Sequence, residues 1–287
     1  MKRRRFLSIL AGAALTAGRA PAAEWQGRAL GAEARILIRG TAAPQALLDR
    51  TRAEIDRIEA IFSLHRASEL TRLNQRGHAA MSPDMRDALT LARHVHDATD
   101  GAFDPGVQPI WQALAAGVAP PSPLPFAGLD VDGDRARLAP GQALTLNGIA
   151  QGIATDRIVG ILADAGLGAV LVDMGETRAL DGDFALEVAD PAAGILGRVT
   201  LRRGRAIATS SPGALVFPSG EGHIFGVRGQ RPQWSTVSVE ASSAALADAA
   251  STAFVLMDRN AIHQSVRRLR LGPVRLVDFD GGLTTLG

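Results

Sequence analysis

The chain has 287 residues, of which 46% are hydrophobic, so it can bury a sizeable core and general disorder is not expected. Its formal charge of +2 depends on residues 1–22, which hold five of the 31 Lys and Arg residues and no acidic residue. The remaining 26 basic residues face 29 acidic ones, a net charge of −3, which argues against a nucleic-acid partner. The sequence contains no cysteine, which excludes disulfides, thiolate chemistry and a lipid-anchored cysteine within it.

Residues 1–22 have the features of an export signal. Arg3-Arg4-Arg5-Phe6-Leu7 is a twin-arginine pattern, and an apolar stretch follows it to about Ala17. Ala20-Pro21-Ala22 then supplies the small residues that a signal peptidase reads. The alternative, an N-terminal membrane anchor, is disfavoured because the apolar run is too short to span a bilayer comfortably. We therefore expect a twin-arginine signal peptide at 1–22 and a periplasmic domain over 23–287 that is not a lipoprotein.

Hydrophobic periodicity and turn residues predict a mixture of strands and helices along the mature chain. The first helix follows from apolar residues at helical spacing, and the second from Ser82 as N-cap with Pro83 after it. In chain order we expect a strand at 35–38, helices at 44–62 and 83–99, a proline-rich loop at 116–129, a strand end at 144–146, a helix at 151–165, strands at 169–172, 184–188 and 236–239, a helix at 245–257, and a strand at 274–279. Strict β-α-β alternation is missing, so the sequence favours the α+β class.

Two glycine-containing stretches have more specific chemistry than a core requires. In Asp100–Pro105 a tight turn, with Trp111 beyond it, can present backbone groups and an aromatic ring to a flat ligand, although an ordinary turn fits as well. Residues Asn147–Asp156 leave a strand and open a helix through Gly148 and Gly152. Free N–H groups at such a helix start suit phosphate, but the spacing is neither that of a Rossmann fingerprint nor that of a P-loop.

Two further stretches carry candidate metal-binding and acid–base residues. Asp248 and Thr252 are four residues apart, so they share one face of the predicted helix and offer two hard oxygens to Mg²⁺. The alternative is an aspartate that satisfies free N–H groups at the helix start. His223 precedes a loop and can act as a general base, although a single histidine is more often structural.

Taken in chain order, these stretches resemble the ApbE family of FAD:protein FMN transferases. The similarity runs from Gly31 to about Met257. The family's Ser-Glu-Leu-x-x-x-Asn, Gly-Ala-Phe-Asp-Pro, Gly-x-Ala-x-Gly-x-Ala-x-Asp, Val-Ala-Thr-Ser and Ala-Asp-Ala-x-x-Thr-Ala motifs are matched at Ser68–Asn74, Gly101–Pro105, Gly148–Asp156, Ile207–Ser210 and Ala247–Ala253. His223 matches the histidine that opens the family's His-Ile-Ile-Asp-Pro motif.

The resemblance implies a T-fold-like α+β architecture and an Mg²⁺-dependent reaction. FMN would pass from FAD to a serine or threonine of an exported or membrane-bound electron-transfer protein, and AMP would leave. The resemblance implies Mg²⁺ ligands at Asp248, Thr252, the backbone of Ser251 and the carbonyl of Ala150, with His223 and Asp248 as catalytic residues. It also implies FAD contacts at Leu30, Leu64, Ala102, Phe103, Asp104, Asn147, Ile153, Ile224 and Phe225.

The chain departs from the family pattern on the flavin-facing side. Gln151 stands where the family usually has Lys, Leu30 replaces a Met, and Leu64 stands near the place where the family usually has a tyrosine or another aromatic residue. Gly226 and Val227 replace the Asp-Pro after His-Ile-Ile, and the family's paired glycines are here Gly175 and Glu176. Besides transfer to a specialised acceptor, two alternatives therefore remain: a flavin-binding or flavin-delivery protein without transfer, and an Mg²⁺-dependent FAD pyrophosphatase that uses water as acceptor.

Overall fold

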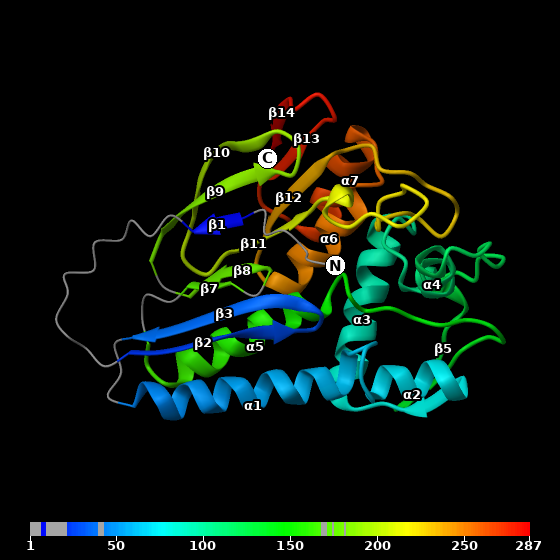
Figure 1. The fold of residues 1–287 in the computed structure, drawn as a ribbon, viewed down its shortest axis with the longest axis horizontal. Coiled ribbons are helices and arrows are strands. Elements are labelled where there is room, and N and C mark those ends of the chain that lie inside the picture. The colour runs from blue at the N-terminus through cyan, green and yellow to red at the C-terminus, as the bar shows by residue number, and fades with distance from the viewer. Residues whose placement is uncertain (1–6, 10–21, 40–42, 168–170, 174, 181) are drawn as a thin grey trace.

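The computed structural model describes residues 7–9, 22–39, 43–167, 171–173, 175–180 and 182–287, and Figure 1 shows their arrangement. Residues 3–6 of the twin-arginine motif and most of the expected cleavage motif lie outside these residues. Within the expected signal segment, Leu7–Ile9 form strand β1, which pairs antiparallel with β9. None of the helices in the described part of the chain is both long and apolar enough to cross a membrane.

The described residues form helices and antiparallel strands in mixed order. The α-helices are α1 (Pro44–Phe62), α2 (Glu69–Arg76), α3 (Pro83–Ala98), α4 (Gln108–Ala116), α5 (Ala150–Asp164), α6 (Ala244–Phe254) and α7 (Arg259–Leu269), and short 3-10 helices are η1 (Pro105–Val107), η2 (Phe126–Gly128) and η3 (Pro212–Ala214). After β1, the strands are β2 (Ala22–Ala29), β3 (Ala32–Arg39), β4 (His78–Ala80), β5 (Asp130–Asp132), β6 (Arg135–Arg137), β7 (Leu171–Asp173), β8 (Thr177–Ala179), β9 (Phe184–Asp190), β10 (Gly194–Leu201), β11 (Ala206–Ser210), β12 (Thr236–Ala241), β13 (Val274–Val277) and β14 (Leu283–Leu286).

The main sheet has eight strands in the order β14-β13-β12-β11-β8-β7-β3-β2, all in antiparallel pairs. Neighbouring side chains on a strand point to opposite faces of a sheet. On β11, Ala208 packs with Ala247 of α6, whereas Ile207 packs with Leu186 of β9. Helix α6 therefore covers one face of the sheet at β11, and the small β1-β9-β10 sheet covers the other (Figure 1).

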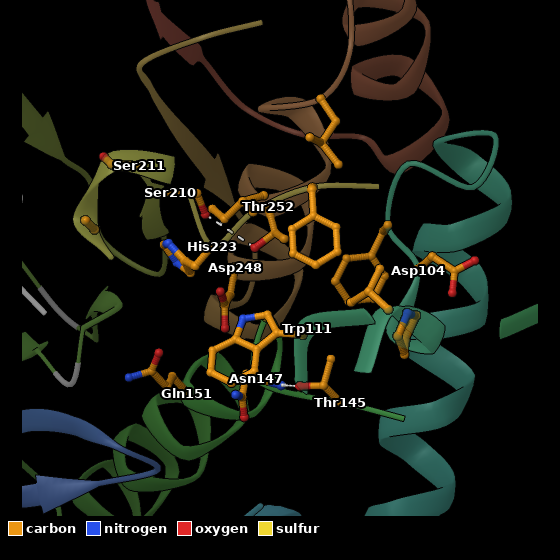
Figure 2. Close-up of a pocket in the computed structure, with 18 of the residues that line it drawn as sticks. Asp104, Trp111, Thr145, Asn147, Gln151, Ser210, Ser211, His223, Asp248 and Thr252 are labelled. Atoms are coloured by element: carbon orange, nitrogen blue, oxygen red, sulfur yellow. Dashed lines mark hydrogen bonds between the residues drawn. The ribbon is translucent and has the colours of Figure 1, made fainter. Parts of the chain in front are cut away.

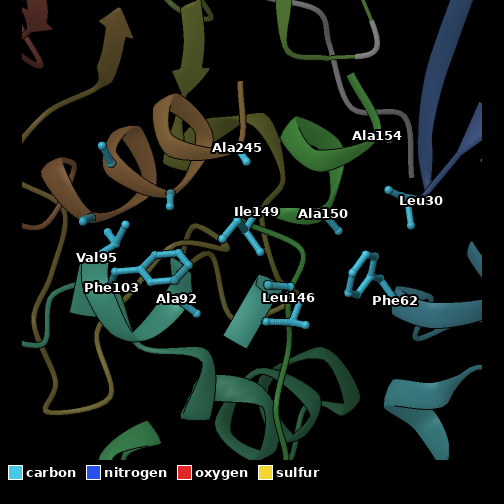
Figure 3. Packing of buried hydrophobic residues seen from close by; sticks show 14 of the residues in the cluster. Leu30, Phe62, Ala92, Val95, Phe103, Leu146, Ile149, Ala150, Ala154 and Ala245 are labelled. Carbon is cyan, nitrogen blue, oxygen red and sulfur yellow. The ribbon is translucent and has the colours of Figure 1, made fainter. Parts of the chain in front are cut away.

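Helix α5 lies between α6 and α1. It packs against α6 on one side and against α1 on the other, and α1 lies along β2 and β3 at the edge of the sheet (Figure 1). Figure 3 shows the resulting core, in which Phe62 of α1, Ala150 of α5 and Ala245 of α6 belong to one buried cluster. Leu146 and Ile149, just before α5, are fully buried in this cluster and fix the position of the helix start.

The α+β prediction is confirmed, and several predicted elements have nearly the expected bounds. Helix α1 covers 44–62 as expected, and α3 begins after Ser82, whose side chain accepts a hydrogen bond from the Met85 N–H at 3.2 Å. The strand expected at 35–38 is the longer β3, the strand expected at 169–172 is described as β7 from Leu171 onward, and those expected at 184–188 and 236–239 are β9 and β12. The periodicity did not predict α2, α4, α7, β10 or β11.

One predicted strand is missing and two predicted elements end earlier than expected, and in two of these three cases side chains explain the difference. Leu144–Leu146 does not form a strand, because the Asn74 amide bonds both the N–H and the C=O of Leu144 at 2.8 Å, where a neighbouring strand would. Helix α6 ends at Phe254, not at 257, and the carbonyls of residues 255–257 accept hydrogen bonds from Gln233 and Trp234. Strand β13 ends at Val277, two residues before the expected end.

Candidate active site

A pocket lies where the end of β11, the middle of α6, the start of α5 and the loops after α3 and η3 meet (Figure 2). It brings together nine of the residues expected in the functional site: Ala102, Phe103, Asp104, Asn147, His223, Ile224, Phe225, Asp248 and Thr252. These residues come from positions 102 to 252 of the chain, so the fold assembles stretches that are far apart in the sequence. The pocket is the candidate active site.

Helix α6 places Asp248 and Thr252 in the pocket. Its first turn is fixed by Ser243, whose hydroxyl accepts a hydrogen bond from the Leu246 N–H at 3.2 Å. One helical turn separates Asp248 from Thr252, so both side chains face the same side, as the spacing predicted. Asp248 is 4% exposed and nevertheless lines the pocket, where its Oδ2 lies 3.4 Å from the backbone nitrogen of Gly152.

The N-terminus of α6 is held against α5 by Asp156. Its two carboxylate oxygens accept hydrogen bonds from the backbone N–H groups of Ala244 at 2.9 Å and Ala245 at 3.1 Å, and Arg178 forms an ion pair with it. The two helices touch at Gly152, where an added Cβ would lie 2.4 Å from the carbonyl oxygen of Ala244. A residue larger than glycine would therefore push apart the two helices that carry the candidate site.

Hydroxyl groups surround the α6 side of the pocket. The Ser210 hydroxyl, at the end of β11, lies 2.8 Å from the Ser251 hydroxyl and 3.3 Å from the Thr252 hydroxyl (Figure 2). Ser251 also donates to the carbonyl oxygen of Asp248 at 3.0 Å, which is a bond within the helix. The Ile207–Ser210 motif therefore contributes a hydroxyl that orients the Thr252 side chain.

The turn at Asp100–Pro105 forms a second wall through its backbone and through Phe103. Gly101 has a φ of 82°, which only glycine adopts without strain. The Asp104 carboxylate points away from Asp248 (Figure 2), and its Oδ1 accepts hydrogen bonds from the N–H groups of Gly106 at 2.7 Å and Phe126 at 2.9 Å. Asp104 therefore holds the loop in place, and its carboxylate does not face the centre of the pocket.

Burial raises the pKa of the Asp104 carboxyl. The backbone N–H groups of Phe126 and Gly106 and the nearby His96 act in the opposite direction but do not compensate for the loss of solvation. His96 Nδ1 is 3.8 Å from Oδ2 of Asp104 and 2.9 Å from the Phe103 carbonyl oxygen. This second histidine supports the pocket wall from behind, a role that the sequence did not indicate.

His223 stands at the opposite side of the pocket from the Asp104 loop (Figure 2). Its Nδ1 is 3.1 Å from the carbonyl oxygen of Pro212 and 3.3 Å from that of Leu215. Two carbonyl acceptors at Nδ1 favour the tautomer that carries the proton there, so Nε2 is the ring atom able to accept a proton. The short turn after η3 thus orients the imidazole and selects its tautomer.

Five expected site residues do not line the pocket. Leu30 is buried in the core with a φ of 51°, its N–H donates to Glu59 at 2.9 Å, and Leu64 and Ile153 pack against the same core. Ala150 is 1% exposed, and Ser251 is fully buried behind Asp248. Conversely, Gln151, Asp173 and Glu176 line the pocket, and of these the sequence indicated only Gln151 and Glu176, as departures from the family pattern.

In the described part of the chain, no group of three or more His, Cys, Asp or Glu side chains is arranged to hold a metal ion. The expected Mg²⁺ ligands include one such side chain, Asp248, together with a hydroxyl and backbone carbonyls. The expectation of Mg²⁺ at this place therefore stays a prediction.

Comparison with known proteins identifies the family. The model of the ApbE family matches residues 30–272. The ApbE protein of Thermotoga maritima is 21% identical, with 92% of this chain and 96% of that chain covered and a TM-score of 0.83. The flavinyl transferase ApbE of Pseudomonas stutzeri (20% identity, 93% and 94% covered, TM-score 0.78) and the flavin transferase ApbE of Vibrio cholerae (21%, 93% and 97%, 0.77) have the same fold. A search of curated proteins found no match. Because the family model covers most of the sequence, the chain belongs to the ApbE family.

Proposed function

We propose that this ApbE-family transferase moves FMN from FAD to a serine or threonine hydroxyl of a partner protein, in an Mg²⁺-dependent reaction that releases AMP. The observation that carries the proposal is the placement of Asp248, Thr252 and His223 around one pocket that also contains Asn147 and the Phe103 wall. The family match and the flavin transferases among the similar structures support the flavin as the transferred group.

The donor set on α6 fits Mg²⁺ chemically. Mg²⁺ prefers oxygen ligands and keeps several waters, so it is often held by one or two carboxylates together with substrate phosphates. The Asp248 carboxylate and the Thr252 hydroxyl, which line the pocket, would hold the ion. The backbone of Ser251 and the carbonyl of Ala150 are the further donors that the family resemblance implies. When bound, the ion would neutralise the pyrophosphate of FAD and the charge on the departing AMP.

His223 is the proposed general base. The acceptor oxygen would bond to the FMN-side phosphorus, its proton would pass to Nε2 of His223, and the bond between that phosphorus and the bridging oxygen of AMP would break. The carbonyls of Pro212 and Leu215 would keep the other ring nitrogen protonated, so Nε2 stays in its accepting form. The flavin undergoes no redox change in this scheme.

The acceptor and its compartment belong to the same proposal. An exported electron-transfer protein is the expected acceptor, and the twin-arginine segment at 1–22 is expected to deliver this enzyme to the periplasm. The two alternatives differ from transfer only in the fate of FAD. A delivery protein would bind FAD and leave it intact, and a pyrophosphatase would pass FMN to water.

One experiment separates these three functions. Purified protein is incubated with FAD and Mg²⁺, with and without a periplasmic acceptor domain that contains a flavinylation site, and free FMN, AMP and covalent flavin are measured. Transfer predicts that AMP and protein-bound flavin form in equal amounts and only with the acceptor. AMP with free FMN in the absence of acceptor would indicate the pyrophosphatase, and bound but unreacted FAD in every sample would indicate the delivery protein.

A further inference from the structure

Three aromatic rings form a cluster at the pocket. The Trp111 and Phe217 ring centroids are 5.3 Å apart with an interplanar angle of 75°, an edge-to-face contact. Phe217 contacts Phe225 in turn, at 6.3 Å and 57°. Phe217 is 5% exposed, whereas Trp111 and Phe225 are half-buried and line the pocket (Figure 2). The buried ring of Phe217 therefore supports two rings that face the ligand space.

The position of Trp111 distinguishes it from an aromatic residue of the core. Phe126 and Phe254 are fully buried, as expected for side chains that only fill the interior. Trp111 lies on α4, which follows η1 directly, so the Pro105–Val107 turn and the Asp104 hydrogen bonds fix where the indole stands. A half-exposed indole on a short, anchored helix is a rigid and accessible surface for a flat ring.

The side chains that line the pocket are acidic rather than basic, so FAD needs a source of affinity other than ion pairs with its pyrophosphate. Its described lining residues include no lysine or arginine, and Gln151 stands where the family usually has Lys. Four buried acidic residues, Asp104, Asp173, Glu176 and Asp248, also line it, and the carboxyl group of Asp104 faces away from its centre. A pyrophosphate that enters this pocket meets negative charge and no cationic side chain from these residues, so electrostatics oppose binding until a metal ion is present.

We propose that Trp111, supported by Phe217, is a stacking platform for a flat heteroaromatic ring of FAD. Stacking would contribute to FAD affinity in a pocket whose described lining residues include no Lys or Arg to bind the pyrophosphate. The proposal rests on FAD being the substrate. FAD carries two such rings, isoalloxazine and adenine, and either can stack on an indole. Stacking of a base on an aromatic side chain contributes about 1–3 kcal/mol, which corresponds to about a 5- to 150-fold change in Kd.

The test measures FAD binding by the full chain, both with Mg²⁺ and in EDTA, by isothermal titration calorimetry and without acceptor. Trp111→Leu is expected to raise the Kd of FAD about 5- to 150-fold, and Trp111→Phe, which keeps a ring, less than about 5-fold. Trp25→Leu is the matched control, because Trp25 lies on β2 and is not among the lining residues. Circular dichroism checks that each variant is folded, and Trp111→Gln replaces Trp111→Leu if the latter is not.

Two further measurements identify the ring that stacks and test whether Trp111 has only a structural role. FMN and ADP are used as competitors, and the competitor that weakens in Trp111→Leu carries the ring that stacks. If that ring is isoalloxazine, contact with indole also quenches the fluorescence of the bound flavin, so Trp111→Phe makes it brighter while the Kd rises less than about 5-fold.

The possible results separate the two proposals. A Trp111→Leu protein that binds FAD within twofold of the parent Kd overturns the platform and leaves the transferase proposal standing. A parent protein that binds no FAD, with or without Mg²⁺, overturns both.

Discussion

Asp248 and Thr252 lie one turn apart on α6, and both side chains line the same pocket. They differ in charge, so their contributions can be separated. Asp248→Asn keeps the shape and removes the negative charge, and it is expected to lower the rate of flavin transfer about 10²- to 10³-fold and to abolish the Mg²⁺ dependence. Thr252→Val removes a neutral oxygen and should cost less. Calorimetric titration with Mg²⁺ and AMP release measure both effects, and unchanged Mg²⁺ affinity in Asp248→Asn would contradict the assignment.

His223→Ala is expected to slow flavin attachment about 10²- to 10⁴-fold while FAD and Mg²⁺ still bind, because a hydroxyl is a poor nucleophile without a base. In the parent protein the rate should fall as the pH drops through the titration of the imidazole, since a protonated ring cannot accept the proton. In-gel fluorescence of the acceptor measures the covalent flavin. If Asp248 is instead both ligand and base, His223→Ala has a small effect and the acidic limb is absent.

Asp156→Ala is expected to lower the free energy of unfolding by about 1–3 kcal/mol, because two N–H groups at the start of α6 lose their acceptor. The same change should reduce activity, since the first turn of α6 fixes the direction of Asp248. Asp164→Ala is the control, because Asp164 is exposed at the end of α5, the helix that also carries Asp156. Urea unfolding measures the stability, and equal stability of the two variants would contradict the role of Asp156.

Asp190 should make stability depend on pH in the acid range. Burial acts to raise the pKa of Asp190, but hydrogen bonds from Ser235, Thr236 and two backbone N–H groups outweigh it, so the pKa is lowered below 3.8. A lowered pKa in the folded state gives a stabilisation that is complete above the unfolded pKa and is lost as the pH falls through the folded pKa. Asp190→Asn should therefore destabilise the protein at pH 7, and the difference from the parent should shrink below about pH 4. Asp280→Asn, at an exposed aspartate, should give no such difference in thermal melts between pH 3 and 7.

Replacing both Arg3 and Arg4 by Lys is expected to retain the protein in the cytoplasm, because the twin-arginine route reads this pair. Immunoblots of periplasmic and cytoplasmic fractions measure the distribution. Normal periplasmic levels of the double variant would mean that another route exports the protein.

The sequence predicted correctly that Asp248 and Thr252 lie on one face of a helix. Two residues four positions apart lie on the same face of any α-helix, so this relationship can be predicted without knowledge of the tertiary structure. Asn74 illustrates the opposite case: its amide replaces a strand partner for Leu144 across 70 positions, which no local pattern reveals. Leu30 and Leu64, expected to contact FAD, do not line the pocket: Leu30 is buried in the core and Leu64 packs against it. An apolar side chain carries no sequence signal that separates a pocket wall from the interior.

The contact at Gly152 makes one side of the pocket a single rigid body. With no room for a Cβ between α5 and the carbonyl of Ala244, the two helices cannot slide past each other without a steric clash. The opposite side is built from Trp111 on α4 and from the turns that follow Pro212. The spacing between Asp248 and the start of α5 is therefore set by a contact with backbone atoms and does not depend on side chains that can change rotamer.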